Sequence, residues 1–274
     1  MIQRKAPRRV LAISAFLGIG AILVSCAAGA PSQRSDEQNK ECTNGVLTPA
    51  NSAITHDPQH THYSIYIEVV NVSSSAISDI MSQIEPFIGC AVREESFLRI
   101  VLDAGEGTEA QVLNGLDGSE IITAVRDLNR KNDRGENKAR EQGVDDISRE
   151  VRDAIELAEP APTGSATRLL SLAASDAANM KPGDQNIVLL WSPLLGTSSS
   201  GEDCLTVTGV EADDANAAAL VDRCVAQGLI QPINTVGVKL VGVGYGSTDA
   251  NQQRFASQIQ EHLYSSIFEV SREG

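Results

Sequence analysis

The chain has 274 residues, of which 42% are hydrophobic and 4% aromatic, and its formal net charge at pH 7 is −14. A surface this acidic repels nucleic acids and anionic lipid headgroups, so we expect no nucleic-acid partner. One tryptophan, four tyrosines and five phenylalanines offer no obvious aromatic platform, which disfavours a carbohydrate-binding module.

The first 25 residues begin with a basic segment, which precedes an apolar run from Val10 to Val24. The end of this run and the next two residues read Leu23-Val24-Ser25-Cys26. This layout resembles a bacterial lipoprotein signal peptide, whose lipobox cysteine is lipidated and becomes the new N-terminus. The run is about 15 residues long, shorter than the roughly 20 of a transmembrane helix. The resemblance implies a palmitate-bearing anchor at Cys26, on the extracytoplasmic face of the cell membrane. The Arg8-Arg9 pair leaves both general and twin-arginine export open.

Residues 26–60 are polar and are interrupted by Pro31, Pro49 and Pro58. This composition predicts a flexible tether between the anchor and a folded domain.

Apart from Cys26, the chain has four cysteines, an even number in a chain with an export signal, which indicates disulfide bonds. These are Cys42, Cys90, Cys204 and Cys224. Three pairings are possible. Local separation favours Cys204 with Cys224, which leaves Cys42 with Cys90. No Cys-x-x-Cys spacing supports a zinc site or a redox pair.

Patterns of strands and helices alternate through residues 61–270. Strands are predicted at 63–70, 97–102, 186–191 and 236–243, with a short hairpin partner at 111–113. Helices are predicted at 76–88, 121–128, 147–158, 167–180, 212–227 and 252–268. The charged run 130–138 is expected to be a solvated helix face or a loop. This order predicts one α/β domain with a doubly wound, mostly parallel sheet flanked by helices.

Hydroxyl side chains gather near three expected strand ends, where open α/β sheets bind ligands. The clusters are residues 71–75, residues 163–165 and Ser192. In this order the chain resembles the von Willebrand factor A-like domains, from Tyr63 to Phe268. Their metal site uses an Asp-x-Ser-x-Ser run after the first strand, a Thr from a Gly-rich loop and an Asp after a buried strand. The resemblance implies one binding site formed by Asn71, Ser73, Ser75, Ser165 and Ser192.

Both carboxylates of that metal site are replaced here, by Asn71 and Ser192. A hard divalent cation relies on such negative oxygen ligands, so we expect a neutral, hydroxyl-rich crevice without a metal. An alternative is that Asn71 and residues 73–75 only cap the helix that follows.

Three other patterns suggest chemistry more weakly. His56, Asp57, His60 and His62 offer metal-ligating side chains. The Gly-rich turn 242–246 follows a strand. A dinucleotide fingerprint would need a helix opening directly from the turn and an acidic residue about 20 positions later, after a second strand, but this turn lies in the last unit of the chain. His262 lies on the last predicted helix, and no Gly-x-Ser-x-Gly elbow accompanies it.

The sequence therefore predicts a lipid-anchored cell-envelope protein that works as a protein-binding or assembly module, with no cofactor. The alternative is an envelope enzyme or a solute-binding lipoprotein whose site is assembled from scattered residues. A deep pocket with perturbed titratable groups would favour the alternative.

Overall fold

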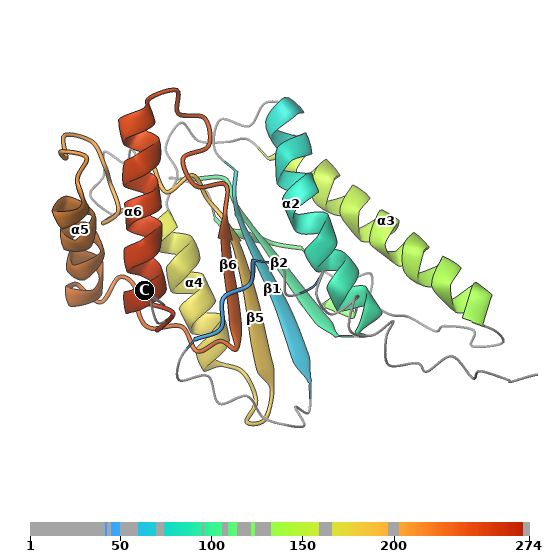
Figure 1. The fold of residues 1–274 in the computed structure, drawn as a ribbon. Coiled ribbons are helices and arrows are strands. Elements are labelled where there is room, and N and C mark those ends of the chain that lie inside the picture. The colour runs from blue at the N-terminus through green and yellow to red at the C-terminus, as the bar shows by residue number, and fades with distance from the viewer. Residues whose placement is uncertain are drawn as a thin grey trace, which may run out of the picture.

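A mostly parallel sheet forms the centre of the fold, and helices cover both of its faces (Figure 1). The computed structural model describes residues 42, 45–49, 60–69, 74–94, 96–105, 109–113, 122–123, 133–158, 166–196 and 203–270.

The sheet has six strands, in the order β3-β2-β1-β5-β6, with β4 also paired to β2. The parallel strands are β1 (Thr61–Glu68), β2 (Phe97–Asp103), β5 (Gln185–Trp191) and β6 (Gly237–Val241). The antiparallel strands are β3 (Gln111–Val112) and β4 (Ile122–Thr123), both on β2. The predicted α/β class and hairpin partner are confirmed.

Five helices flank the sheet in the described part of the chain. They are α2 (Ser74–Arg93), α3 (Asp133–Leu157), α4 (Ala166–Ala178), α5 (Asp214–Ala226) and α6 (Ala250–Ser266). In β1, Ile65 and Ile67 pack towards α2, whereas Tyr66 packs on the side of α4 and α6. Both faces of the central strands are therefore buried, which explains their nearly continuous apolar sequence. None of the described helices is both long and apolar enough to cross a membrane.

Residues 121–128, predicted as a helix, include the short strand β4. Ile122 and Thr123 pair with β2, and residues 124–128 lie outside the described residues. Both side chains are β-branched, which favours a strand, and an available edge of β2 overrides the helical spacing.

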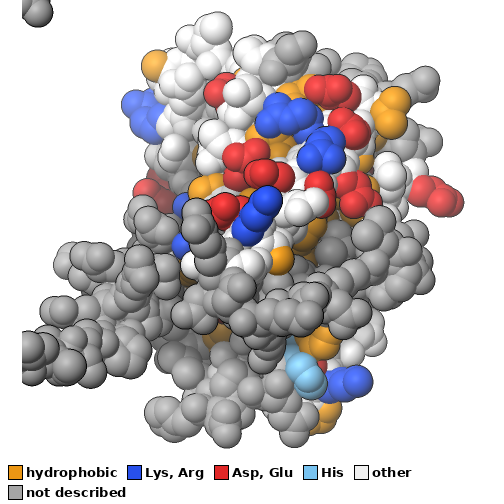
Figure 2. Space-filling model, turned by 90° about the vertical axis from the view of Figure 1, so that its right-hand side faces the viewer, with side chains coloured by type: hydrophobic (Ala, Val, Ile, Leu, Met, Phe, Trp, Pro, Cys, Tyr) orange, Lys and Arg blue, Asp and Glu red, His pale blue; other side chains and the backbone are white. Residues whose placement is uncertain are grey.

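The charged run 130–138 is helical from Asp133 onward, because α3 begins there. One stripe of α3, Ile147, Val151 and Ile155, is buried in the same core cluster as α2. On the side of the molecule that carries α3, acidic and basic side chains are interleaved, with apolar side chains between them (Figure 2).

The cysteines form the two pairs that local separation favoured, Cys42–Cys90 and Cys204–Cys224. The first pair ties a segment of the expected tether to α2. In the same segment, Leu47 exchanges two backbone hydrogen bonds with Val238 of β6, at 2.8 and 2.9 Å. Residues 45–49 therefore pack on the sheet, N-terminal to the expected domain boundary at residue 61.

Candidate functional site

Two polar side chains meet where the central parallel strands end. Glu68 is the last residue of β1, and Ser192 follows β5, the neighbour of β1 in the sheet. In the sheet, β2 lies on one side of β1 and β5 lies on the other side, so the strand order reverses at β1. Ligand sites of open α/β sheets lie at such a switch point, so this end of the sheet is where a ligand site is expected.

Glu68 and Ser192 are buried and bonded to each other. Glu68 is 3% exposed and Ser192 is 1% exposed. The Ser192 hydroxyl donates to Glu68 Oε2, and the Leu194 backbone N–H donates to Ser192 Oγ at 3.1 Å. Leu194 has a φ of 54°, a left-handed conformation that costs a non-glycine residue about 1–3 kcal/mol. The turn after β5 is therefore held in a strained form by its contacts.

Burial raises the pKa of Glu68 to about 8. The hydrogen bond from Ser192 opposes this shift, the carboxylates of Asp203 and Asp103 add to it, and Arg168 opposes it. Glu68 therefore keeps its proton at neutral pH, because ionising it would place another negative charge in a dry, acidic environment.

Asp103, at the end of β2, is fully buried and is bound by Arg168 of α4. Arg168 Nε donates to Asp103 Oδ2 at 2.8 Å, and Nη2 donates to Oδ1 and, at 2.7 Å, to the Gly105 carbonyl. The Gly105 N–H also donates to Asp103 Oδ1, at 2.9 Å. This two-pronged ion pair fixes the start of α4 against the end of β2.

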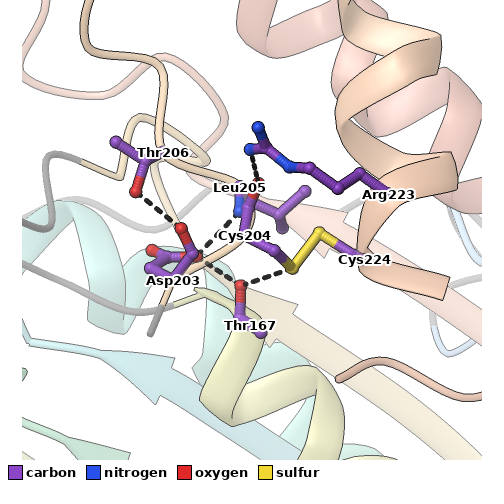
Figure 3. Close-up of a disulfide and its surroundings, with 7 residues drawn as sticks. All are labelled: Thr167, Asp203, Cys204, Leu205, Thr206, Arg223 and Cys224. Carbon is purple, nitrogen blue, oxygen red and sulfur yellow. Dashed lines mark hydrogen bonds between the residues drawn. A yellow bond between two sulfur atoms is a disulfide. The ribbon is translucent and has the colours of Figure 1, made fainter. Parts of the chain in front are cut away.

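A third buried carboxylate, Asp203, lies beside the Cys204–Cys224 disulfide (Figure 3). It accepts hydrogen bonds from the Thr167 hydroxyl and, at 3.0 Å, from the Leu205 N–H. A Cβ on Gly196 would lie 2.5 Å from Asp203 Oδ2, so the carboxylate occupies space that only a glycine leaves open. Thr167 lies in the first turn of α4, where a negative charge is favoured by the helix dipole.

The structure brings one of the five predicted binding residues, Ser192, into this strand-end cluster of Glu68, Asp103, Asp203, Thr167, Arg168 and Ser192. Ser75 lies on α2 and is exposed. Asn71, Ser73 and Ser165 lie outside the described residues.

The sequence interpretation of the strand ends considered hydroxyl side chains, whereas three carboxyl side chains also lie at this end of the sheet: Glu68, Asp103 and Asp203. The sequence pattern does not reveal Glu68 and Asp103 as site residues, because each is the last residue of a mostly apolar strand. Their register could have signalled the cluster, since the two residues are direct partners in the β1–β2 pairing. Asp203 gave no such signal, because its place depends on the loop between β5 and α5.

The other sequence candidates occupy separate places. His60 and His62 bind the two carboxylate oxygens of Asp184, at 3.2 and 3.0 Å, at the start of β1; His56 and Asp57 lie outside the described residues. Burial alone would raise the pKa of Asp184, but these hydrogen bonds lower it. Among the described residues, no group of three or more His, Cys, Asp or Glu side chains is arranged to hold a metal.

His262 Nε2 lies 2.9 Å from Asp214 Oδ1, on the outside of the pair α5 and α6. The Gly-rich turn after β6 packs on a side chain. Gly242 has a φ of 78°, and a Cβ there would lie 2.7 Å from Trp191 Cε2. Close packing on Trp191 therefore accounts for this glycine without a nucleotide.

A second feature is an open hollow of about 450 Å³ beside α3, which we call the α3 hollow. It is lined by β3 and the following residue and by one face of α3: Gln111, Leu113, Asp146, Arg149, Glu150, Asp153, Ala154 and Leu157. Leu157 is 82% exposed, more than the other large apolar side chains in the described part of the chain. A single exposed leucine is ordinary at a protein surface, and what distinguishes Leu157 is its place in a hollow beside charged side chains.

The sequence matches no protein-family model, and no curated protein is similar enough to it to serve as a relative. Function is therefore inferred from the geometry of these two regions.

Proposed function

We propose that this chain is a lipid-anchored protein of the cell envelope whose α/β domain, similar to the von Willebrand factor A-like domains, binds other proteins. Cys26 carries the lipid and holds the mature protein on the extracytoplasmic face of the membrane. The domain works as a binding or assembly module and does not depend on a divalent metal.

The observation that carries the binding role is the α3 hollow. It joins an exposed apolar side chain, Leu157, to a rim of charged side chains on a long helix. Protein-binding patches combine an apolar centre with a polar rim in this way. The hollow is open to solvent and not deeply enclosed, which suits contact with a surface of another protein.

The contacts at the strand ends also favour binding over catalysis. Ser192 is bonded to Glu68, Thr167 to Asp203, and Arg168 to Asp103. These contacts engage both hydroxyl groups and the guanidinium group within the folded chain, so they stabilise the loops that they join.

One observation favours the second candidate, an envelope enzyme or solute-binding protein. Glu68 is a buried acid that keeps its proton at neutral pH, as a general acid does. Glu68→Gln distinguishes the two functions, because glutamine keeps the shape and removes the proton. If the domain is a binding module, the Glu68→Gln variant should still bind its protein partner and keep its activity in cells. A variant that binds the partner but loses that activity would favour the enzyme.

The anchor is tested by Cys26→Ala, with membrane and soluble fractions compared after cell lysis. We expect the variant to leave the membrane or to remain unprocessed, because the lipid has no other attachment point. Ser257→Ala, at an exposed position on α6, is the control and should stay on the membrane. A processed Cys26→Ala protein that is retained like the unchanged protein would refute the anchor.

Partner binding is tested by a photo-crosslinking amino acid in place of Leu157 in intact cells. The control carries it at Leu229, which is 37% exposed on the loop after α5. We expect a crosslinked protein from position 157 and not from position 229. Identical patterns from both positions, or no crosslink from position 157, would contradict a binding role of the α3 hollow.

A further inference from the structure

We infer that the α3 hollow receives a segment of a partner protein in which lysine or arginine flanks an apolar side chain. This inference rests on the proposed protein-binding function and adds the chemistry of the partner. It is carried by the way apolar and charged side chains are arranged on one face of α3.

Spacing along α3 places the relevant residues on one face. Asp146, Glu150, Asp153 and Leu157 follow one another at intervals of three or four residues in an unbroken helix, so their side chains form a row. All four line the hollow. A partner segment that lies along this face meets three carboxylates and then the exposed leucine.

Apolar side chains form the floor and one end of the hollow. Leu113, which follows β3, is buried, Ala154 is half-buried, and Leu157 stands out at the end of the helix. Covering Leu157 removes apolar surface from water, which favours association. The partner must therefore present at least one apolar side chain at this end.

The rim has unbalanced negative charge. Arg149 lies 3.2 Å from Asp146 and neutralises it. Glu150 and Asp153 have no ion-pair partner among the described residues. Two carboxylates beside an apolar floor attract a cationic group, whereas an acidic segment would be repelled. Charge complementarity therefore selects a basic partner.

The volume of the hollow limits the size of what enters it. About 450 Å³ is within the range of pockets that hold a few side chains or a small molecule. The hollow therefore accepts the side chains of one segment, with the rest of the partner outside.

The test uses the purified full-length protein and two fluorescein-labelled peptides of ten residues. In the first peptide two arginines flank a pair of leucines; in the second, glutamates replace the arginines. Fluorescence anisotropy gives the two affinities. We expect the basic peptide to bind at least tenfold more tightly than the acidic one, and to lose affinity as salt is raised. Equal binding of both peptides, or no binding of either, would overturn the inference.

Variants then locate the binding. Glu150→Lys together with Asp153→Lys should weaken binding of the basic peptide about tenfold, since each exposed ion pair contributes modestly. The control is Asp145→Lys with Glu141→Lys, which makes the same charge change on α3 at exposed positions that do not line the hollow. A similar loss in the control would mean that the overall negative charge attracts the peptide, and would overturn the inference.

Leu157→Ser tests the apolar contact, with Leu229→Ser as its control. Only Leu157→Ser should weaken binding of the basic peptide. If Leu157→Ser instead splits a dimer seen by analytical ultracentrifugation, the hollow belongs to a second copy of the chain and the inference falls. If a protein crosslinks to position 157 in cells but the peptides bind equally, the binding function stands and only the basic chemistry of the partner is refuted.

Discussion

Ser192, just after β5, donates its hydroxyl hydrogen to Glu68, at the end of β1, across the two neighbouring central strands. This contact joins the two strands at the switch point of the sheet and places a protonated carboxyl group where α/β proteins hold their ligands. Burial of this carboxyl group raises its pKa and makes the stability of the fold depend on pH, which provides the first prediction.

Glu68→Gln should make stability less dependent on pH. The pKa of Glu68 rises from 4.5 to about 8 on folding. Between pH 4.5 and about 8, the unfolded state loses a proton that the folded state keeps. As the pH rises through this range, the contribution of Glu68 to the free energy of unfolding therefore falls by up to about 1.4 kcal/mol per pH unit, and it is constant below and above the range. Urea unfolding at pH 5, 6.5 and 8 measures this slope.

The matched control for this change is Glu150→Gln on the exposed face of α3, which should keep the slope of the unchanged protein. The prediction fails if Glu68→Gln and the unchanged protein lose stability in parallel as the pH rises from 5 to 8.

Arg168→Met should destabilise the fold by about 3 kcal/mol, because it leaves the fully buried Asp103 as an uncompensated charge. Adding Asp103→Asn should recover part of the loss, since the remaining side chain is neutral. Chemical unfolding of the single and double variants measures both effects. A double variant less stable than Arg168→Met would show that the ion pair is not the main cause.

Gly242→Ala should cost about 1–3 kcal/mol more than Gly209→Ala. Both glycines have a positive φ, 78° and 75°, so both changes impose backbone strain. A Cβ on Gly242 overlaps Trp191, whereas nothing lies within 4 Å of one on Gly209, and overpacking supplies the difference. Thermal unfolding of the two variants compares them, and equal destabilisation would rule out the overlap.

Loss of either disulfide should lower stability by several kcal/mol. Cys204–Cys224 spans 20 residues and Cys42–Cys90 spans 48, which corresponds to about 3 and 4 kcal/mol in the chain-entropy account. Replacing each pair with alanines and measuring urea unfolding tests this. Mass mapping of the oxidised protein should find these two links, and crossed pairs would refute them.

Millimolar magnesium or calcium should leave the melting temperature nearly unchanged. Arg168 already neutralises Asp103, and Glu68 keeps its proton, so neither offers the free negative oxygen that a hard cation needs. A ligand that binds weakly adds little stability, because the gain follows RT ln(1 + [L]/Kd). A clear upward shift with either cation, absent with sodium at equal ionic strength, would contradict this prediction.

The sequence alone predicted the α/β class, the parallel central strands and the flanking helices. These follow from local periodicity, because a strand such as β5, buried on both faces, must be apolar along its whole length. Cysteine separation likewise favoured the pairs that the structure contains. Local periodicity did not predict the strand β4 within residues 121–128, because Ile122 pairs with an edge of β2, a strand formed by an earlier part of the chain.

The strand-end cluster depended on tertiary structure. Glu68, Asp103 and Asp203 lie far apart in the chain, and only the parallel register and the loop after β5 bring them to the start of α4. Their burial, and the proton that Glu68 keeps, follow from neighbours that no local pattern reveals. The α3 hollow has the same origin: the spacing on α3 is visible in the sequence, but the wall it shares with β3 exists only after the sheet has formed.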